Sequence, residues 1–308
     1  MSKLTLFSRA TASCIALAAS VLWLSPAQLA AQDERTVVAV NYALSYFAER
    51  ILDTDAEVIF PVPEDADPSF WNPSIAAIST MQRADLILLN GAGFATWTTK
   101  ASLPRSKIVN TSRGFEEQYI KTETVTHSHG ADGEHSHTGT ATYMWLDPEL
   151  AVLQAQAIAA AAEQRDLAEP ADINDRLGAL TEDLEALDAS ATELTSVGAG
   201  QHLIATHPRY QYLARAYDLE ISSLEWDAGA SPDPAQLSEL EQLMEDTGAK
   251  VLIWEAEPSG EAREAVRAMG LSDVVFPTLA TTPLGSDYLK SYATAVDELT
   301  NALKNVNE

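Results

Sequence analysis

Cysteine is nearly absent from the sequence, which contains only Cys14 among its 308 residues. That residue falls in an N-terminal stretch in which Lys3 and Arg9 precede an apolar run and small residues follow. This arrangement is typical of a secretory signal peptide, so we predict that residues 1–31 are removed during export. A mature chain without cysteine forms no disulfide and no thiolate metal site, which excludes finger-type and ribbon-type zinc sites.

Positive charge is scarce as well. The chain carries 19 Lys and Arg against 45 Asp and Glu, a formal net charge of −26. Nucleic acid and anionic membrane surfaces repel such a chain, so we expect neither as a partner, whereas a cationic ligand is electrostatically compatible. Beyond the N-terminal stretch, no apolar run is long enough to cross a bilayer. We therefore predict a protein that does not span the membrane.

The common enzyme motifs are also missing. The sequence contains no G-x-S-x-G nucleophile elbow, no Walker loop and no H-E-x-x-H zinc motif. The glycines in the stretch NGAGF lack the third glycine of a dinucleotide-binding fingerprint. We therefore predict that the protein is not an enzyme.

Strand-like and helical runs alternate along both halves of the chain, which indicates parallel α/β sheets. Between the halves, leucines and alanines recur every three or four residues from Leu177 to Leu194, as on the buried stripe of a long helix. The apolar runs typical of strands cover residues 36–41, 57–62, 85–90 and 107–110 in the first half and residues 202–206, 221–226, 250–254 and 273–276 in the second.

These patterns predict an α/β fold with two small parallel-sheet lobes joined by a long linker helix. About 275 mature residues remain after the signal peptide, enough for two ordinary hydrophobic cores. We place the N-terminal lobe at residues 32–146, the linker helical region at residues 147–198 and the C-terminal lobe at residues 199–308.

Histidine is concentrated in one short segment. Four of the six histidines lie within eleven residues, at His127, His129, His135 and His137. Neutral imidazole is the commonest side-chain ligand of transition metals, and His-x-His spacing lets two rings reach one ion. Glycines within the segment disfavour a helix. We therefore predict a mobile, metal-binding His-rich loop over residues 126–138.

A fifth histidine, His207, occupies a position typical of binding sites. It directly follows the predicted strand 202–206, and α/β sheets bind their ligands beyond the carboxyl ends of the strands. His202, at the opposite end of this strand, is predicted to be structural. Four carboxylates also fall at or just after predicted strand ends and can offer oxygen ligands to the same cleft: Asp67, Glu225, Asp227 and Glu255.

Four stretches resemble the zinc- and manganese-binding receptors of bacterial ABC importers, the cluster A-I family. They are EVIFPVP followed by ADLILLNGAGF, HSHGADGEHSH before YMWLDPELA, ATHPRYQYLARAYDL, and TTPLGSDYLKSY. The resemblance covers nearly the whole mature chain and implies two α/β lobes, a long joining helix and a metal ion in the interlobe cleft. It also implies a monomeric periplasmic protein that delivers its ion to the membrane permease of an ABC importer.

The ligand positions that the resemblance implies are kept only in part. His207 matches the family's second-lobe histidine. Asp67 stands in place of the first-lobe histidine, or Ser69 does if the alignment shifts. Tyr143 stands where the family has a histidine four residues before the aspartate of WLDP, and it stays a candidate although protonated tyrosine is a poor zinc ligand. Thr282 replaces the closing aspartate.

The nature of the ion and two other functions stay open. The clustered histidines favour zinc, nickel or copper, whereas His207 with carboxylates such as Glu255 is a harder set, closer to manganese. We predict zinc. One alternative function is a periplasmic metal buffer or chaperone that uses the His-rich loop without a permease. The other, less favoured, is a metal-dependent hydrolase built on His207 and carboxylates around an open coordination position.

Overall fold

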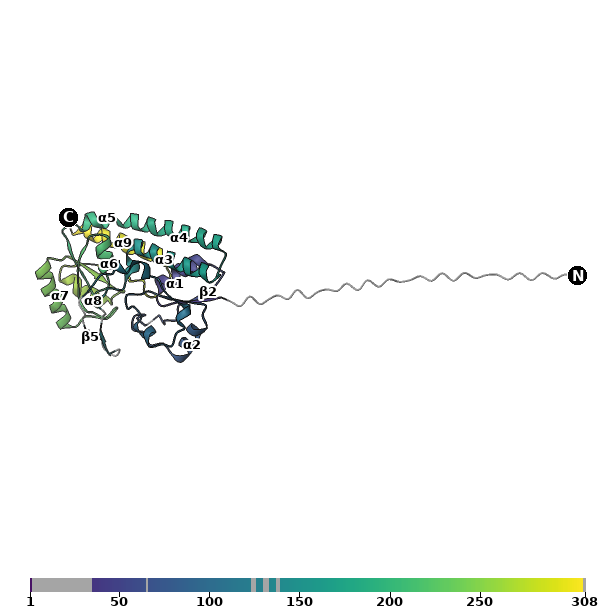
Figure 1. Cartoon of the computed structure of the whole chain (residues 1–308). Coiled ribbons are helices and arrows are strands. Elements are labelled where there is room, and N and C mark those ends of the chain that lie inside the picture. The colour runs from purple at the N-terminus through teal and green to yellow at the C-terminus, as the bar shows by residue number, and fades with distance from the viewer. Residues whose placement is uncertain (2–34, 65, 123–125, 130–132, 137–138, 307–308) are drawn as a thin grey trace. The chain divides into compact units, whose positions relative to one another are not determined.

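The computed structural model (Figure 1) describes Met1 and residues 35–306, except residues 65, 123–125, 130–132 and 137–138. Apart from Met1, the predicted signal peptide therefore lies outside the described residues. Residues Glu34–Glu308 form one compact unit that contains two parallel four-stranded sheets. Each sheet is the framework of one lobe.

The first lobe has the strand order β2-β1-β3-β4, with all its strands parallel. The strands β1 and β3 are almost wholly buried, because continuous runs of Val and Leu suit strands that are covered on both faces. The elements of this lobe are β1 (Thr36–Ala39), α1 (Tyr42–Leu52), β2 (Glu57–Ile59), α2 (Ile75–Arg83), β3 (Leu86–Leu89) and β4 (Ile108–Asn110).

The second lobe repeats this topology. Its first strand along the chain, β7, pairs with the second strand on one side and with the third on the other, as β1 does in the first lobe. The elements of this lobe are β7 (His202–Ala205), α6 (Gln211–Ala216), β8 (Glu220–Ser223), α7 (Pro234–Thr247), β9 (Val251–Trp254), α8 (Gly260–Ala268) and β10 (Ser272–Val275).

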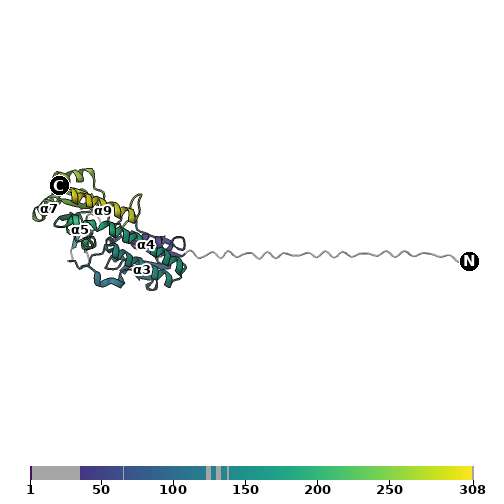
Figure 2. The same ribbon diagram turned by 90° about the horizontal axis from the view of Figure 1, so that it is seen from above.

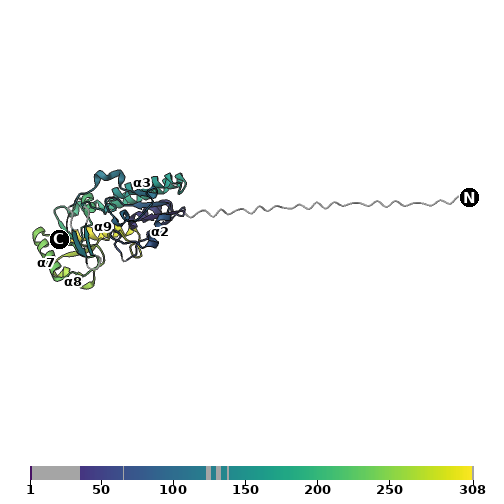
Figure 3. The same ribbon diagram turned by 60° about the horizontal axis from the view of Figure 1, so that its bottom comes forward.

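Long helices connect the two sheets. They are α3 (Pro148–Gln164), α4 (Pro170–Ala191), α5 (Glu193–Gly198) and the terminal α9 (Tyr288–Asn305). The helix α4 packs against both α3 and α9 (Figure 2), and its predicted apolar stripe is buried. The helices α7 and α8 lie at one end of this compact unit, and α2 lies towards the other (Figures 1 and 3). The predicted fold class, two parallel α/β lobes with a long joining helix, is confirmed.

One continuous core runs through the lobes and the joining helices. It includes Val38 of the first sheet, Leu184 of α4, Leu299 of α9 and Leu203 of the second sheet, all fully buried. None of the helices in the described part of the chain combines the length and the apolar character needed to cross a membrane.

Most strands are one or two residues shorter than the sequence predicts, and β2 and β8 end three residues early. The strand β2 ends at Ile59, because Pro61 lacks the N–H that the ladder requires. The strand β8 ends at Ser223. The N–H groups of Leu224 and Trp226 still donate to Ala205 and Thr206, so the chain follows β7 for three more residues and carries Glu225 to the end of the sheet.

The segment predicted as a His-rich loop contains a short antiparallel ribbon. The strands β5 (Thr126–His129) and β6 (Gly133–Ser136) pair with His127 opposite His135 and His129 opposite Gly133. A bridge between Lys121 and Thr140 brings the two ends of the segment together, which accounts for a ribbon in place of an open loop. Short 3-10 helices complete the first lobe at Thr96–Thr99, Arg105–Lys107, Arg113–Gln118 and Met144–Leu146.

Candidate metal centre

His207 is buried at the carboxyl end of β7, where the sequence predicts a site residue, with only 5% of its surface exposed. Its Nδ1 atom lies 3.1 Å from Glu255 Oε2, and its Nε2 atom lies 3.9 Å from Glu225 Oε2. These two carboxylates follow β9 and β8, the strands on either side of β7. The sheet topology therefore places the imidazole between two carboxylates, as the strand-end positions predict.

Arg209, two residues further on, is not among the predicted site residues and lies at the centre of the site. Its guanidinium donates to Asp67 Oδ2 over 2.8 Å, and its Nε atom lies 3.6 Å from Glu255 Oε1. The guanidinium carbon also lies 4.7 Å from the ring centroid of Tyr143. The side chain of Arg209 is only 4% exposed. A buried cation thus joins a carboxylate of the first lobe to one of the second.

Asp67 reaches this place from the loop between β2 and α2. The backbone N–H of Ser69 donates to its Oδ1 atom over 2.7 Å, while Oδ2 receives Arg209. Both carboxylate oxygens of Asp67 therefore already have donors. We call Asp67, Tyr143, His207, Arg209 and Glu255 the interlobe cluster.

Tyr143 lies on the first-lobe side of the cluster and is buried. Its hydroxyl lies 3.4 Å from Ser69 Oγ, and burial raises its pKa well above the ordinary value for tyrosine. The phenol therefore stays protonated at neutral pH. Beneath the guanidinium of Arg209 its ring acts as a cation-π partner, and a protonated phenol is a poor metal ligand.

Charge in the cluster is balanced within the protein. Burial alone would raise the pKa of Glu255, but Arg209 and the hydrogen bond with His207 lower it to about 2. Burial disfavours the charged form of Arg209, yet Tyr143, Asp67 and Glu255 together raise its pKa above the ordinary value. Burial raises the pKa of Glu225 to about 7. At neutral pH, Glu255 is therefore an ionised partner of Arg209.

The donors of the interlobe cluster are not grouped as a metal site. Within the described residues, no three His, Cys, Asp or Glu side chains are arranged so that they could hold an ion. The positively charged guanidinium lies between the carboxylates of Asp67 and Glu255, and both are bound to it. The ligand roles predicted for His207, Asp67, Tyr143 and Glu255 therefore stay predictions.

The remaining candidates lie away from this cluster. In the β5–β6 ribbon, His127, His129 and His135 have the register given above, and His137 lies outside the described residues. Thr282, at the family's closing aspartate position, is exposed. His202 lies at the amino end of β7, where its Nε2 atom is 2.8 Å from Ser222 Oγ.

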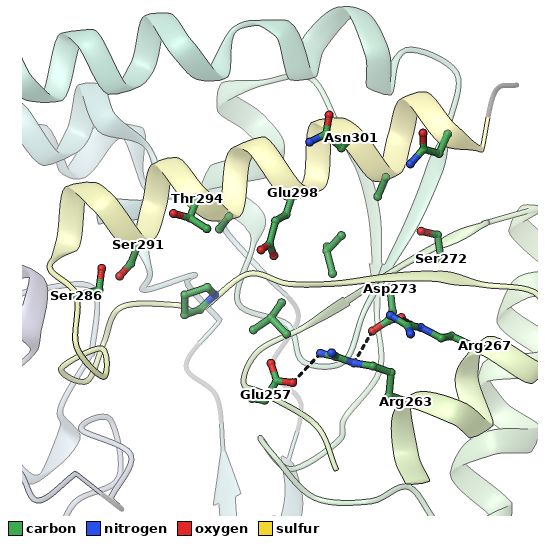
Figure 4. Close-up of a pocket in the computed structure, with 16 residues that line it drawn as sticks. Glu257, Arg263, Arg267, Ser272, Asp273, Ser286, Ser291, Thr294, Glu298 and Asn301 are labelled. Carbon is green, nitrogen blue, oxygen red and sulfur yellow. Dashed lines mark hydrogen bonds and ion pairs between the residues drawn. The ribbon is translucent and has the colours of Figure 1, made fainter. Parts of the chain in front are cut away.

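A different hollow, of about 630 Å³, lies between α8, β10 and α9 (Figure 4). Its arginines are engaged within the protein: the side chain of Asp273 lies 3.0 Å from Arg263 and 2.5 Å from Arg267. Glu257 adds a further contact to Arg263 at 3.0 Å. This ion-pair cluster flanks β10, two strands away from β7, and contains no member of the interlobe cluster.

The residues of both lobes fit a known family. A family model described as zinc-uptake complex component A, periplasmic (ZnuA), matches residues 37–305. The chain belongs to the ZnuA family. Its members are substrate-binding components of transporters, which confirms the predictions of the family and of a protein that is not an enzyme.

Individual relatives of the ZnuA family are distant. The zinc-binding lipoprotein AdcA of Streptococcus pneumoniae is 24% identical over 294 residues, covering 91% of this chain and 57% of AdcA. The chain thus spans little more than half the length of that relative. The high-affinity zinc uptake system protein ZnuA of Bacillus subtilis is 26% identical over 256 residues, covering 80% of this chain and 79% of the relative.

Solved structures support the same fold. The metal-dependent lipoprotein YcdH of Bacillus subtilis superposes with a TM-score of 0.73 at 22% identity, covering 87% of this chain and 99% of YcdH. At this identity the likeness concerns the fold alone.

The signal that could have identified Arg209 is the isolated basic residue in the ZnuA-like stretch ATHPRYQYL, next to His207 in a chain that is poor in positive charge.

Proposed function

We propose that this member of the ZnuA family is a periplasmic receptor for a divalent metal ion, which it delivers to the membrane permease of an ABC importer. The observation that carries the proposal is the match of the family model across both lobes, from residue 37 to residue 305. The acidic chain, with a formal net charge of −26, suits a cationic cargo.

Zinc is the ion that we propose. Four clustered histidines supply the borderline-soft nitrogen ligands that zinc accepts readily, and manganese prefers oxygen ligands. The register of β5 with β6 places His127 opposite His135, and residues opposite each other in an antiparallel ladder have α-carbons about 5 Å apart. The zinc-binding relatives AdcA and ZnuA agree with this choice.

The proposal is tested with the purified chain and with its transporter. Calorimetric titration with Zn²⁺ and Mn²⁺ is expected to show tighter binding of zinc. Reconstitution with the permease and the ATPase of a zinc ABC importer from the same organism is expected to make zinc uptake into vesicles depend on this chain. A chain that binds neither ion would refute the proposal.

A periplasmic zinc buffer or chaperone is the second candidate function. The observation that favours it is the position of Arg209, bound to both Asp67 and Glu255, which leaves the His-rich ribbon as the richest set of metal donors. A buffer would bind zinc as the receptor does but would leave uptake into the reconstituted vesicles unchanged. The transport measurement therefore separates the two functions.

A further inference from the structure

Arg209 pairs with carboxylates from both lobes within the interlobe cluster. Its guanidinium contacts Asp67 of the first lobe at 2.8 Å and Glu255 of the second at 3.6 Å. A buried charge is costly unless it is paired and hydrogen-bonded, so each buried member of this set depends on the others. The carboxylates need a positive charge between them, and the chain itself provides one.

We propose that Arg209 acts as a resident cation that excludes a divalent metal ion from the interlobe cluster. The inference rests on the proposed function, because it specifies which donors of a metal receptor do not take the ion. It assigns Arg209 as a residue that determines binding specificity.

The distances explain the exclusion. A zinc ion binds carboxylate oxygen at about 2.0–2.2 Å. An ion at that distance from Asp67 Oδ2 would share the oxygen that the guanidinium already holds at 2.8 Å. The two cations would then lie within a few ångströms of each other in a buried place, where like charges repel more strongly than in water. A metal can enter only if the guanidinium leaves.

Several contacts oppose its departure. The guanidinium lies over the ring of Tyr143 and within 6.0 Å of the ring centroid of Phe70. Glu255 is held in turn by His207 at 3.1 Å and by the hydroxyl of Thr278 at 3.5 Å. The guanidinium therefore has aromatic rings beside it and a carboxylate partner that is itself held in position. A metal ion would have to displace the guanidinium from both.

The test measures zinc affinity in a full-length background in which His127, His129, His135 and His137 are all replaced by Gln, so that the ribbon does not dominate. In this background we compare Arg209 with Arg209→Ala and Arg209→Gln. Either neutral variant is expected to bind zinc at least about tenfold more tightly, a gain of about 1.4 kcal/mol. Zinc is also expected to raise the melting temperature of these variants more than that of the parent.

Two control variants separate exclusion from simple charge counting. Arg215→Ala removes one positive charge and the ion pair between Arg215 and Asp147, at 3.0 Å, but leaves Asp67 and Glu255 paired with Arg209. Arg209→Lys keeps a positive charge in the cluster. Both variants are expected to retain the low affinity of the parent. Arg209→Gln guards against misfolding of the Ala variant, because it keeps a donor for Asp67.

Equal zinc affinity in the parent and the neutral Arg209 variants would overturn the inference, as would an equal gain from Arg215→Ala or Arg209→Lys. The proposed function is judged separately, on the chain with the four histidines of residues 127–137 intact. If that chain binds no zinc while the Arg209 variants do, the proposed function fails and the exclusion by Arg209 stands.

Discussion

The interlobe cluster and the β5–β6 ribbon offer metal donors in opposite ways. The cluster draws its residues from four distant parts of the chain, near positions 67, 143, 207 and 255, and holds its own compensating cation. The sequence around the ribbon gathers four histidines within eleven residues that contain no Lys or Arg. Donors alone therefore do not make a metal site. The charge already present among them decides whether an ion can enter.

The lobes are also held together by contacts outside the cluster. The indole N–H of Trp145, from the segment before α3, donates to the carbonyl of Thr278 in the second lobe over 2.7 Å. From α9, the Tyr292 hydroxyl donates to the carbonyl of Leu146 over 2.7 Å, and Tyr288 bonds to the carbonyl of Trp145. Because these bonds do not involve Arg209, we expect variants at that position to change the cluster and to leave the arrangement of the lobes intact.

The largest expected effect is on the metal-free stability of Arg209→Ala. Removing one partner of a buried ion pair typically costs 3–5 kcal/mol, and because Asp67 is 36% exposed we expect about 3 kcal/mol for this variant. Urea unfolding in the presence of a chelator measures the loss. Lys304→Ala is the matched control, since its ion pair with Glu193 joins side chains that are 45% and 53% exposed and should contribute less than about 1 kcal/mol. Equal losses would mean that the cluster is no more dependent on its cation than an exposed site is.

The next effect concerns the ribbon. Replacing the four histidines of residues 127–137 by Gln is expected to weaken zinc binding by the chain about 100-fold, close to 2.7 kcal/mol, because Asp67 and Glu255 of the interlobe cluster are paired with Arg209. Titration calorimetry with Zn²⁺ measures the change. Replacing Ser128 and Ser136 in the same ribbon by Ala should leave affinity unchanged. Retained affinity in the Gln variant would place the zinc in the interlobe cluster instead.

A smaller effect concerns acid stability, which depends on Glu255. Its pKa is about 2 in the folded protein and ordinary when unfolded, so its stabilisation is complete above about pH 4.5 and is lost as the pH falls towards 2. We expect it to account for about 2 kcal/mol of the acid-induced loss. In Glu255→Gln, unfolding free energies measured without metal should vary less over this range. If the unfolding free energy of Glu255→Gln depends on pH as that of the parent does, the result would argue against the pairing of Glu255 with Arg209.

Glu225 provides a control of opposite sign. Burial raises its pKa to about 7, so the folded state binds the proton more tightly, and Glu225 lowers stability as the pH rises from about 4.5 to 7. Glu225→Gln should remove this decline and leave the pH dependence of stability below pH 4.5 unchanged. The two variants together show whether burial or the guanidinium governs each carboxylate.

No effect on zinc affinity is expected from His202→Ala. His202 lies at the amino end of β7, bonded to Ser222 and 3.4 Å from Glu220, at the end of the sheet opposite His207. Calorimetric titration of this variant against the parent measures the difference. A loss of zinc binding would show that a residue outside the ribbon and the interlobe cluster also binds zinc.

Much of the fold follows from patterns that are local in the sequence. Buried strands such as Val251–Trp254 appear as unbroken apolar runs, and α3 begins where Asp147 caps the helix and Pro148 takes its first position. The strand-end placement of His207, Glu225 and Glu255 also follows, because parallel strands direct their carboxyl ends to one edge of a sheet. The strand ends at Ile59 and Ser223 were less predictable, since they depend on a proline and on neighbouring strands.

Local patterns in the sequence are thus enough to predict the two α/β lobes, the joining helix, the clustered histidines and the edge on which His207 lies. The surroundings of His207 depend on how the lobes pack. Asp67 and Glu255 are separated by 188 positions, and nothing local to either shows that Arg209 will lie between them. Local propensity fixes where strands and helices begin and end, whereas the pairing of buried charges depends on which distant side chains the packed lobes bring within a few ångströms.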